Sequence, residues 1–185
     1  MRWVLGAALA GLGVSGWLVI ERYSAPEVDA GLARAVLPLI DQELERGPWT
    51  GLLTSARPES GPRWFCAQRV VETGRDGAEL RVGLLAHCVE YGRADGALIG
   101  GSGEQCAKLV VLTGGSGRWT VTRIESSPDG HAAAGWEREH FSPAAVRRLH
   151  DWLGASPDLS EDVTAQARLA FGLPPDAPVR SVSRP

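Results

Sequence analysis

The stretch AELRVGLLAHCVEY, residues 78–91, decides the fold, because its apolar residues recur at the two-residue period of a β-strand. The apolar positions that share one face of this strand are Leu80, Val82, Leu84, Ala86 and Cys88. Arg81 and His87 fall on the other face. Since only one face is strongly apolar, we expect helices to cover a single side of the sheet.

Other segments with a β-type composition flank this strand. They cover residues 63–72, 97–99, 105–113 and 118–126. The glycine-containing or aspartate-glycine turns that separate them lie at 74–77, 94–96 and 114–117. A Gly-Gly-Ser-Gly bend at 100–103 can also form a bulge that curls the sheet. Because short turns join successive segments, the pattern predicts a four-stranded antiparallel meander.

A helical pattern precedes the β region. Apolar residues recur at three- and four-residue steps from Val28 to Leu44, and Gly47-Pro48 then ends the helix. Ser24 and Glu27 have the spacing of a capping box, in which each side chain satisfies a backbone N–H at the start of a helix. We therefore expect the helix to begin at these residues.

Two shorter helical patterns follow the β region. Ser142-Pro143 supplies an N-cap and a proline at the first helical position, and a last helix starts at Asp158. Residues 173–185 form a polar, proline-containing tail that we expect to lack regular structure. The sequence thus predicts one α+β domain over residues 24–172, with an N-terminal helix, a four-stranded antiparallel meander and C-terminal helices.

This layout is that of cystatin-like and NTF2-like domains. Short motifs in the chain also resemble uncharacterised bacterial proteins that are anchored to a membrane or secreted. The motifs are Trp64-Phe65-Cys66, Gly100-Gly101-Ser102-Gly103 and Ser127-Pro128-Asp129-Gly130, and the similarity spans about residues 62–150. The resemblance implies export and a small α+β fold, and it implies no catalytic residue.

The N-terminal segment, residues 1–22, predicts attachment to a membrane. Residues 3–20 contain no ionisable side chain, and a helix of this length spans about 27 Å, close to the hydrocarbon thickness of a bilayer. Arg2 precedes the apolar run, so we expect a single-pass anchor with the domain outside the cell membrane. Glu21-Arg22-Tyr23 is unfavourable next to a cleavage site, which favours this anchor over the alternative, secretion after cleavage.

Three cysteines, one on each of the first three predicted strands, are the most testable candidates. Outside the cytoplasm cysteines tend to pair. Strand register brings Cys66 close to Cys88, and we favour this disulfide; a Cys88–Cys106 bridge is the alternative. Three buried free thiols are a further interpretation. A bridge that closes a loop of this size would contribute about 3 kcal/mol to stability.

No catalytic, cofactor-binding or metal-binding motif is evident in the sequence. The histidines, which lack the close spacing of metal ligands, are His87, His131, His140 and His150. The glycine segments at 100–103 and 114–117 lack the P-loop lysine and join strand to strand, so we interpret them as turns. Glu90 has no partner carboxylate at a fixed spacing, and Asp129 belongs to a Pro-Asp-Gly turn.

The charge balance limits the classes of function. A net charge of −3 and a pI near 5.8 provide no basic patch, so nucleic acid is not an expected partner. We expect a non-enzymatic, membrane-tethered domain that binds a protein or cell-envelope ligand. The alternative is an NTF2-like small-molecule binder or enzyme with a pocket between the sheet and the first helix. A filled core would favour the first hypothesis, and a deep pocket with converging Asp, Glu or His side chains would favour the second.

Overall fold

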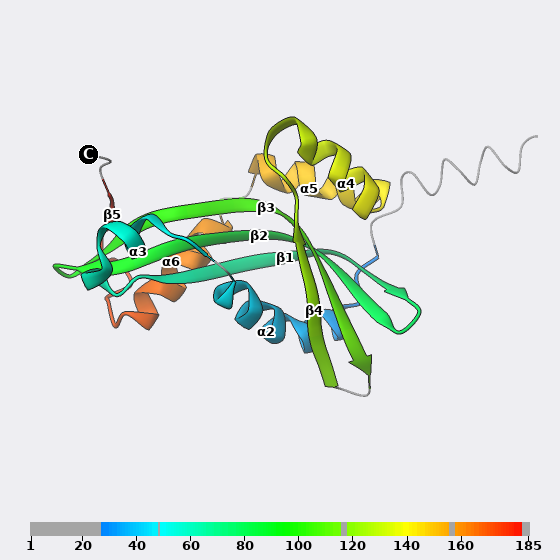
Figure 1. The fold of residues 1–185 in the computed structure, drawn as a ribbon, viewed down its shortest axis with the longest axis horizontal. Helices are drawn as coiled ribbons and strands as arrows, with labels where there is room; N and C mark the ends of the chain where they lie inside the picture. Colours follow the sequence, from blue (N-terminus) through cyan, green and yellow to red (C-terminus); the bar gives the residue numbers. More distant parts are fainter. Residues whose placement is uncertain (1–26, 48, 116–117, 156–157, 183–185) are drawn as a thin grey trace, which may run out of the picture.

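The computed structural model describes residues 27–47, 49–115, 118–155 and 158–182. Its helices are α2 (Ala30–Arg46), α3 (Leu52–Ala56), α4 (Ala133–His140), α5 (Pro143–Ala155) and α6 (Asp158–Ala170), with short 3-10 helices at Pro58–Ser60 and Gly130–Ala132. Its strands are β1 (Arg63–Asp76), β2 (Glu79–Ala94), β3 (Ala97–Gly115), β4 (Arg118–Ser126) and β5 (Val179–Ser181). Figure 1 carries the same labels.

The strands form one sheet in the order β1-β2-β3-β4, with every neighbouring pair antiparallel (Figure 1). This order confirms the predicted meander in a mixed α+β fold. β3 continues without a break through residues 100–103, where its register with β2 shifts so that two residues of β3 lie opposite Glu90 alone. The glycine segment is therefore a β-bulge inside one long strand.

Helices cover both faces of the sheet, so the expectation of a single covered side is wrong. On the face that we call the α2 face, Ile40 of α2 packs with Leu84 of β2, and both are fully buried. On the opposite face, which we call the α6 face, Leu85 packs with Leu149 of α5 and Val163 of α6. Figure 1 shows α2 and α5 on opposite sides of the strands.

The sequence of β2 alone does not reveal the hydrophobic core on the α6 face. Its α6 face carries Arg81 and His87, but Leu85 between them is fully buried. Gly83 lets Phe141 approach the sheet, since a Cβ atom there would lie 2.7 Å from the Phe141 ring. Neighbouring strands supply the other apolar side chains of this core, among them Phe65, Leu109 and Val111.

The first described helix begins later than the capping-box spacing predicts. Asp29 is the N-cap of α2, and its Oδ1 atom accepts hydrogen bonds from the backbone N–H groups of Gly31 and Leu32, both at 2.9 Å. Glu27 lies before this cap, where its carbonyl accepts a bond from Thr73 N–H, so it is not the third residue of the helix. The predicted partner Ser24 lies outside the described residues.

Part of the C-terminal tail is ordered, which corrects the prediction that residues 173–185 lack regular structure. β5 pairs in parallel with β3 over Leu98–Gly100, beyond the part of β3 that pairs with β4. Leu98 N–H donates to the carbonyl of Pro178 at 3.0 Å. Unpaired backbone groups at a sheet edge favour such an addition, and the composition of the tail alone did not indicate it.

None of the helices in the described ranges has the length and hydropathy needed to cross a bilayer. The predicted membrane anchor, residues 3–20, lies outside the described residues.

Candidate functional site

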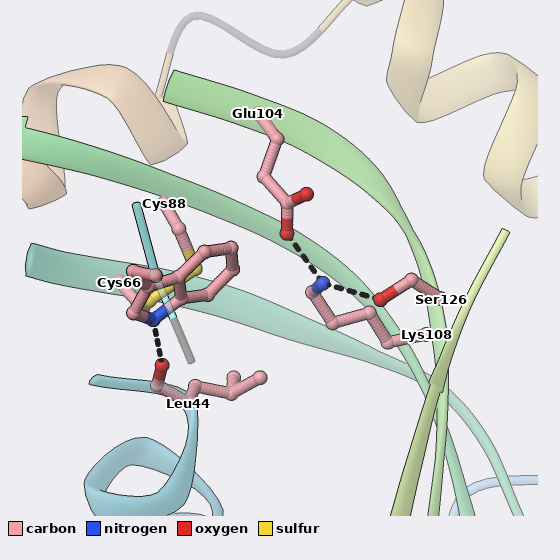
Figure 2. A network of polar contacts seen from close by, with 7 residues as sticks. Leu44, Cys66, Cys88, Glu104, Lys108 and Ser126 are labelled. Carbon is pink, nitrogen blue, oxygen red and sulfur yellow. Dashed lines mark hydrogen bonds and ion pairs between the residues drawn. A yellow bond between two sulfur atoms is a disulfide. The ribbon is translucent and has the colours of Figure 1, made fainter. Parts of the chain in front are cut away.

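A buried lysine lies on the α2 face, at the point where α2 ends. Lys108 is the single lysine among 19 basic residues of the chain, and its side chain is 2% exposed. Its Nζ atom donates to Ser126 Oγ at 2.8 Å and forms an ion pair with Glu104, as Figure 2 shows. These two partners, one of them a carboxylate, make the buried charge tolerable.

Two stacked tryptophans adjoin this lysine. The rings of Trp49 and Trp64 lie 4.5 Å apart at an interplanar angle of 18°, and Lys108 Nζ lies 5.5 Å from the centre of the Trp49 ring. Trp49 Nε1 donates to the carbonyl of Leu44 at 2.6 Å. The last carbonyls of a helix have no partner within it, so this bond both caps α2 and fixes the orientation of the indole.

A pocket of about 510 Å³ opens between the end of α2 and strand β4. We call it the α2-end pocket, and its lining residues are Glu43, Leu44, Arg46, Gly47, Trp49, Lys108, Ile124 and Ser126. Its volume is in the range of small-molecule sites, which combine an apolar wall with a few fixed polar groups. Here the wall comes from Trp49, Leu44 and Ile124.

The polar groups of the α2-end pocket are arranged for binding rather than for proton transfer. Ser126 accepts a hydrogen bond from Lys108, whose ammonium is also ion-paired, so the lysine is not placed to remove the serine proton. Glu43 pairs with Arg46 at 3.2 Å at the exposed rim. A general base must lie within hydrogen-bond reach of the group whose proton it removes, and among the described residues Glu43 forms no hydrogen bond with Ser126.

The structure joins Cys66 to Cys88 in a disulfide and leaves Cys106 as a free thiol. Cys66 and Cys88 are direct partners in the β1–β2 register. Cys106 lies opposite Ala86, two residue pairs along from Cys88, so the alternative bridge would join diagonal positions. Burial raises the pKa of the Cys106 thiol, and the neighbouring Lys108 offsets this only in part, so the thiol stays protonated and unreactive near neutral pH.

Glu90, which has no partner in the sequence pattern, caps a helix from a distance. Its carboxylate accepts bonds from the N–H groups of Leu53 (2.8 Å) and Thr54 (2.7 Å) at the start of α3, and from the Thr54 hydroxyl (2.7 Å). Burial alone would raise its pKa, but these hydrogen bonds outweigh burial and lower it. Gly51 and Gly101 allow this contact, because a Cβ atom at either would lie within 2.5 Å of the carboxylate.

The histidines are separated in the structure. His140 Nε2 lies 3.3 Å from Glu125, and His150 Nε2 lies 2.8 Å from the buried Glu137. His87 lies on the α6 face, opposite to Cys88, and burial lowers its pKa. Asp129 precedes a 3-10 helix without a side-chain capping bond, and His131 in that helix is exposed. Within the described residues, no group of three or more His, Cys, Asp or Glu side chains could hold a metal ion.

The central residues of the α2-end pocket, Lys108, Trp49 and Ser126, were not among the candidates from sequence. The one available signal was the lysine itself, placed in an apolar strand of a chain that otherwise uses arginine. A charged residue in such a position is rarely buried unless it has partners. The tryptophans gave no such signal, because apolar side chains at those positions are equally typical of a core.

No protein-family model, curated protein or solved structure matches the chain.

Proposed function

We propose that the chain is a membrane-tethered, extracytoplasmic binding domain, without enzymatic activity, that receives a protein or cell-envelope ligand at the α2-end pocket. The observation that carries this proposal is that the space between α2 and the sheet is partly filled by core side chains and partly open. Val36, Ile40 and Leu84 fill most of that space and are fully buried. An opening of about 510 Å³ lies at the end of α2, beside Trp49 and Lys108, and it is larger than the pockets beside Leu32 and Asp41 of the same helix.

The composition of the pocket supports binding over catalysis. Its flat aromatic wall offers contact area at a low cost in side-chain entropy, because Trp49 is already held by Trp64 and by the Leu44 carbonyl. Its charged groups already have ion-pair partners: Glu43 pairs with Arg46, and Lys108 pairs with Glu104. A ligand that enters would therefore meet a preformed surface rather than reactive groups.

Several features support the extracytoplasmic location. The apolar segment at 3–20 has the length of a membrane span, with positive charge at its N-terminal flank. The Cys66–Cys88 disulfide is of the kind that persists outside the reducing cytoplasm. We also propose that this arrangement of a helix, a meander and further helices is cystatin-like or NTF2-like.

A second candidate function, an NTF2-like small-molecule binder, is favoured by one observation. The α2-end pocket lies between the sheet and the first described helix, and its volume of about 510 Å³ would accommodate a small molecule. The two functions differ in what occupies the pocket in the cell, either a free metabolite or a group that projects from a larger ligand. A covalent trap inside the pocket separates them.

The binding proposal is tested by photocrosslinking in intact cells. A benzophenone-bearing amino acid replaces Glu43 at the pocket rim in the full chain, and Gln42, which is exposed and does not line the pocket, is replaced in the control. We expect position 43 to give a protein or envelope-polymer adduct that position 42 does not give. Trp49→Ala should abolish this adduct, since it removes the aromatic wall.

Adducts of the same kind and yield from both positions would contradict a pocket-specific ligand. A small-molecule adduct from position 43 alone would select the second candidate. The location has its own test, because protease added to spheroplasts should degrade the domain. Complete protection of the chain would contradict the extracytoplasmic orientation.

A further inference from the structure

β1 forms one edge of the sheet, and the chain itself covers part of this edge. Near the β1–β2 hairpin, Thr73 N–H donates to the carbonyl of Glu27 at 2.8 Å, and the Arg148 side chain donates to the carbonyl of Val71 at 3.2 Å. An edge strand presents backbone groups with which another strand can pair, and proteins usually protect them. The contacts at residues 71–73 provide such protection.

Next to this covered part, around Gln68, the edge of β1 is open. Cys66 and Cys88 are direct partners whose Cα atoms lie 4.1 Å apart, which is near the short spacing of a pair that exchanges no hydrogen bonds. The backbone groups of Cys66, and by alternation those of Gln68 and Val70, therefore point away from β2. Among the described residues, none forms a backbone hydrogen bond with Gln68 or Val70 on this outer side. The stretch can accept another strand.

A pocket of about 410 Å³ adjoins this open stretch. We call it the β1-edge groove, and its lining residues are Asp41 of α2, Cys66, Ala67 and Gln68 of β1, and Asp162, Ala165, Gln166 and Leu169 of α6. Cys66 belongs to the core on the α2 face, whereas Ala67 belongs to the core on the α6 face. A pocket that touches both faces of an outer strand opens around the edge of that strand.

The β1-edge groove has an acidic side chain on each face, Asp41 on α2 and Asp162 on α6. Burial raises the pKa of Asp41, although a hydrogen bond from Gln68 opposes the rise. The carboxylates therefore lack full hydration, and a nearby cation would favour their ionised form. None of the described lining residues is basic, and the adjacent Arg69 lies over the Trp152 ring at 5.9 Å. The groove thus favours a cationic ligand.

We propose that the β1-edge groove binds an extended, basic segment of a partner protein, which pairs with β1 as an added strand. Main-chain hydrogen bonds to Gln68 and Val70 supply affinity in this mode of recognition, and the side chains supply specificity. Successive side chains of a strand point to opposite faces, so two consecutive basic residues meet Asp41 on one face and Asp162 on the other. The exposed Leu169 adds an apolar contact at the rim.

Charge argues against a second copy of this chain as the occupant. Two copies that paired through β1 about a two-fold axis would place the acidic walls of their grooves against each other. Like charges that face each other across an interface disfavour association. The β1-edge groove also goes beyond the proposed function, because the sheet residues that line the α2-end pocket belong to β3 and β4.

The test is fluorescence anisotropy of a labelled synthetic peptide with the full chain in a non-ionic detergent. The peptide is rich in valine and threonine with a central Lys-Arg pair, and its control carries a central Glu-Glu pair. We expect saturable binding of the basic peptide alone. Substituting both Asp41→Asn and Asp162→Asn should weaken it roughly tenfold or more, because both counter-charges are lost. The matched control Asp151→Asn, at an exposed position of α5, should leave the affinity unchanged.

Methylation of the peptide backbone separates strand pairing from simple charge attraction. A peptide of the same sequence with every main-chain amide methylated keeps its charge but has no N–H to donate, so we expect it not to bind. Gln68→Pro removes an outward N–H of β1 and should also abolish binding. Gln68→Ala is its matched control, because it removes the same side chain and keeps the N–H.

Absence of saturable binding by the Lys-Arg peptide would overturn the proposal. Equal binding of the Glu-Glu or the methylated peptide would overturn it as well, because neither result requires an added strand that carries positive charge. If Gln68→Pro does not fold, the methylated peptide decides. Sedimentation of the full chain without peptide examines the other occupant. A dimer that dissociates when the basic peptide is absent from the sample but Gln68→Pro is present would assign the edge to a second copy and contradict a separate partner.

Discussion

The two faces of the sheet solve the problem of buried charge in different ways. On the α2 face, Lys108 is almost completely buried, and its ammonium is held by Glu104 and Ser126. On the α6 face, Arg81 is half-buried and has no partner in the described chain, but none of its nitrogens is both buried and unbonded, so water solvates its guanidinium. A nearly buried charge therefore needs protein partners, whereas a partly exposed charge does not.

The difference follows from where the helices end. α2 continues until its last carbonyls meet Trp49, so the lysine beneath is enclosed by protein groups. α4 ends at His140, and Arg81 lies in an open recess beside it, two residues along β2 from Gly83. The proposed ligand site lies at the end of α2, and apolar side chains fill the cores beneath the helices on both faces.

The largest expected effect tests whether both faces are true cores. Leu84→Ala on the α2 face and Leu85→Ala on the α6 face should each lower the free energy of unfolding by about 3 kcal/mol, because both leucines are fully buried. Urea denaturation of the full chain in non-ionic detergent, followed by tryptophan fluorescence, measures both. A cost below about 1 kcal/mol for Leu85→Ala alone would mean that the α6 face is not a packed core.

The next effect separates the disulfide from the free thiol on the α2 face. The double substitution Cys66→Ala and Cys88→Ala should lower the free energy of unfolding by about 3 kcal/mol, mainly because the unfolded chain gains conformational entropy when the bridge is removed. Cys106→Ala closes no loop, and its cost should stay below about 1 kcal/mol. Thiol titration of the unfolded, unreduced wild type should give one free thiol, and three would contradict the bridge.

A smaller effect concerns Glu90, whose pKa is lowered in the folded protein. Glu90→Gln should cost about 2 kcal/mol near neutral pH, because charge-assisted bonds to the start of α3 are weakened. A lowered folded pKa stabilises the protein above the ordinary value of 4.5, and this contribution is lost as the pH falls below it. The difference between wild type and Glu90→Gln should therefore shrink in acid. A difference that stays constant down to the acid transition would exclude this assignment.

The smallest effect sharpens the contrast between the two buried cations. Arg81→Met removes a charge that has no partner in the described chain, so the free energy of unfolding should change by no more than about 0.5 kcal/mol. Thermal unfolding of the wild type and the variant measures this. A large loss of stability in the variant would show that Arg81 has a structural partner.

The sequence predicted the order of the elements well, because each signal was local. The alternation of β2, the cap at Ser142 and the glycine turns all depend on neighbouring residues. The number of covered faces was not predictable in the same way, since the α6 face is built from Phe65, Leu85 and Leu109 on three different strands. The choice of partner for Cys88 depended on register, which the turn between β1 and β2 largely determines.

The candidate sites were less accessible to prediction than the fold. Lys108 and Ser126 are eighteen residues apart and meet only because β3 and β4 pair in the observed register. The role of Glu90 depends on a helix that begins more than thirty residues earlier in the chain. Such contacts are set by tertiary structure, and no periodicity within a single segment records them.

The length of α2 has a consequence for how the tethered chain proposed above would meet a ligand. α2 contains 17 residues and is therefore about 25 Å long. One end adjoins Glu27, where the chain arrives from the predicted anchor, and the other end forms the wall of the α2-end pocket. The length of the helix thus limits the distance between the pocket and the bilayer surface. A ligand fixed in the envelope at a greater height would be out of reach, however well its chemistry matched the pocket.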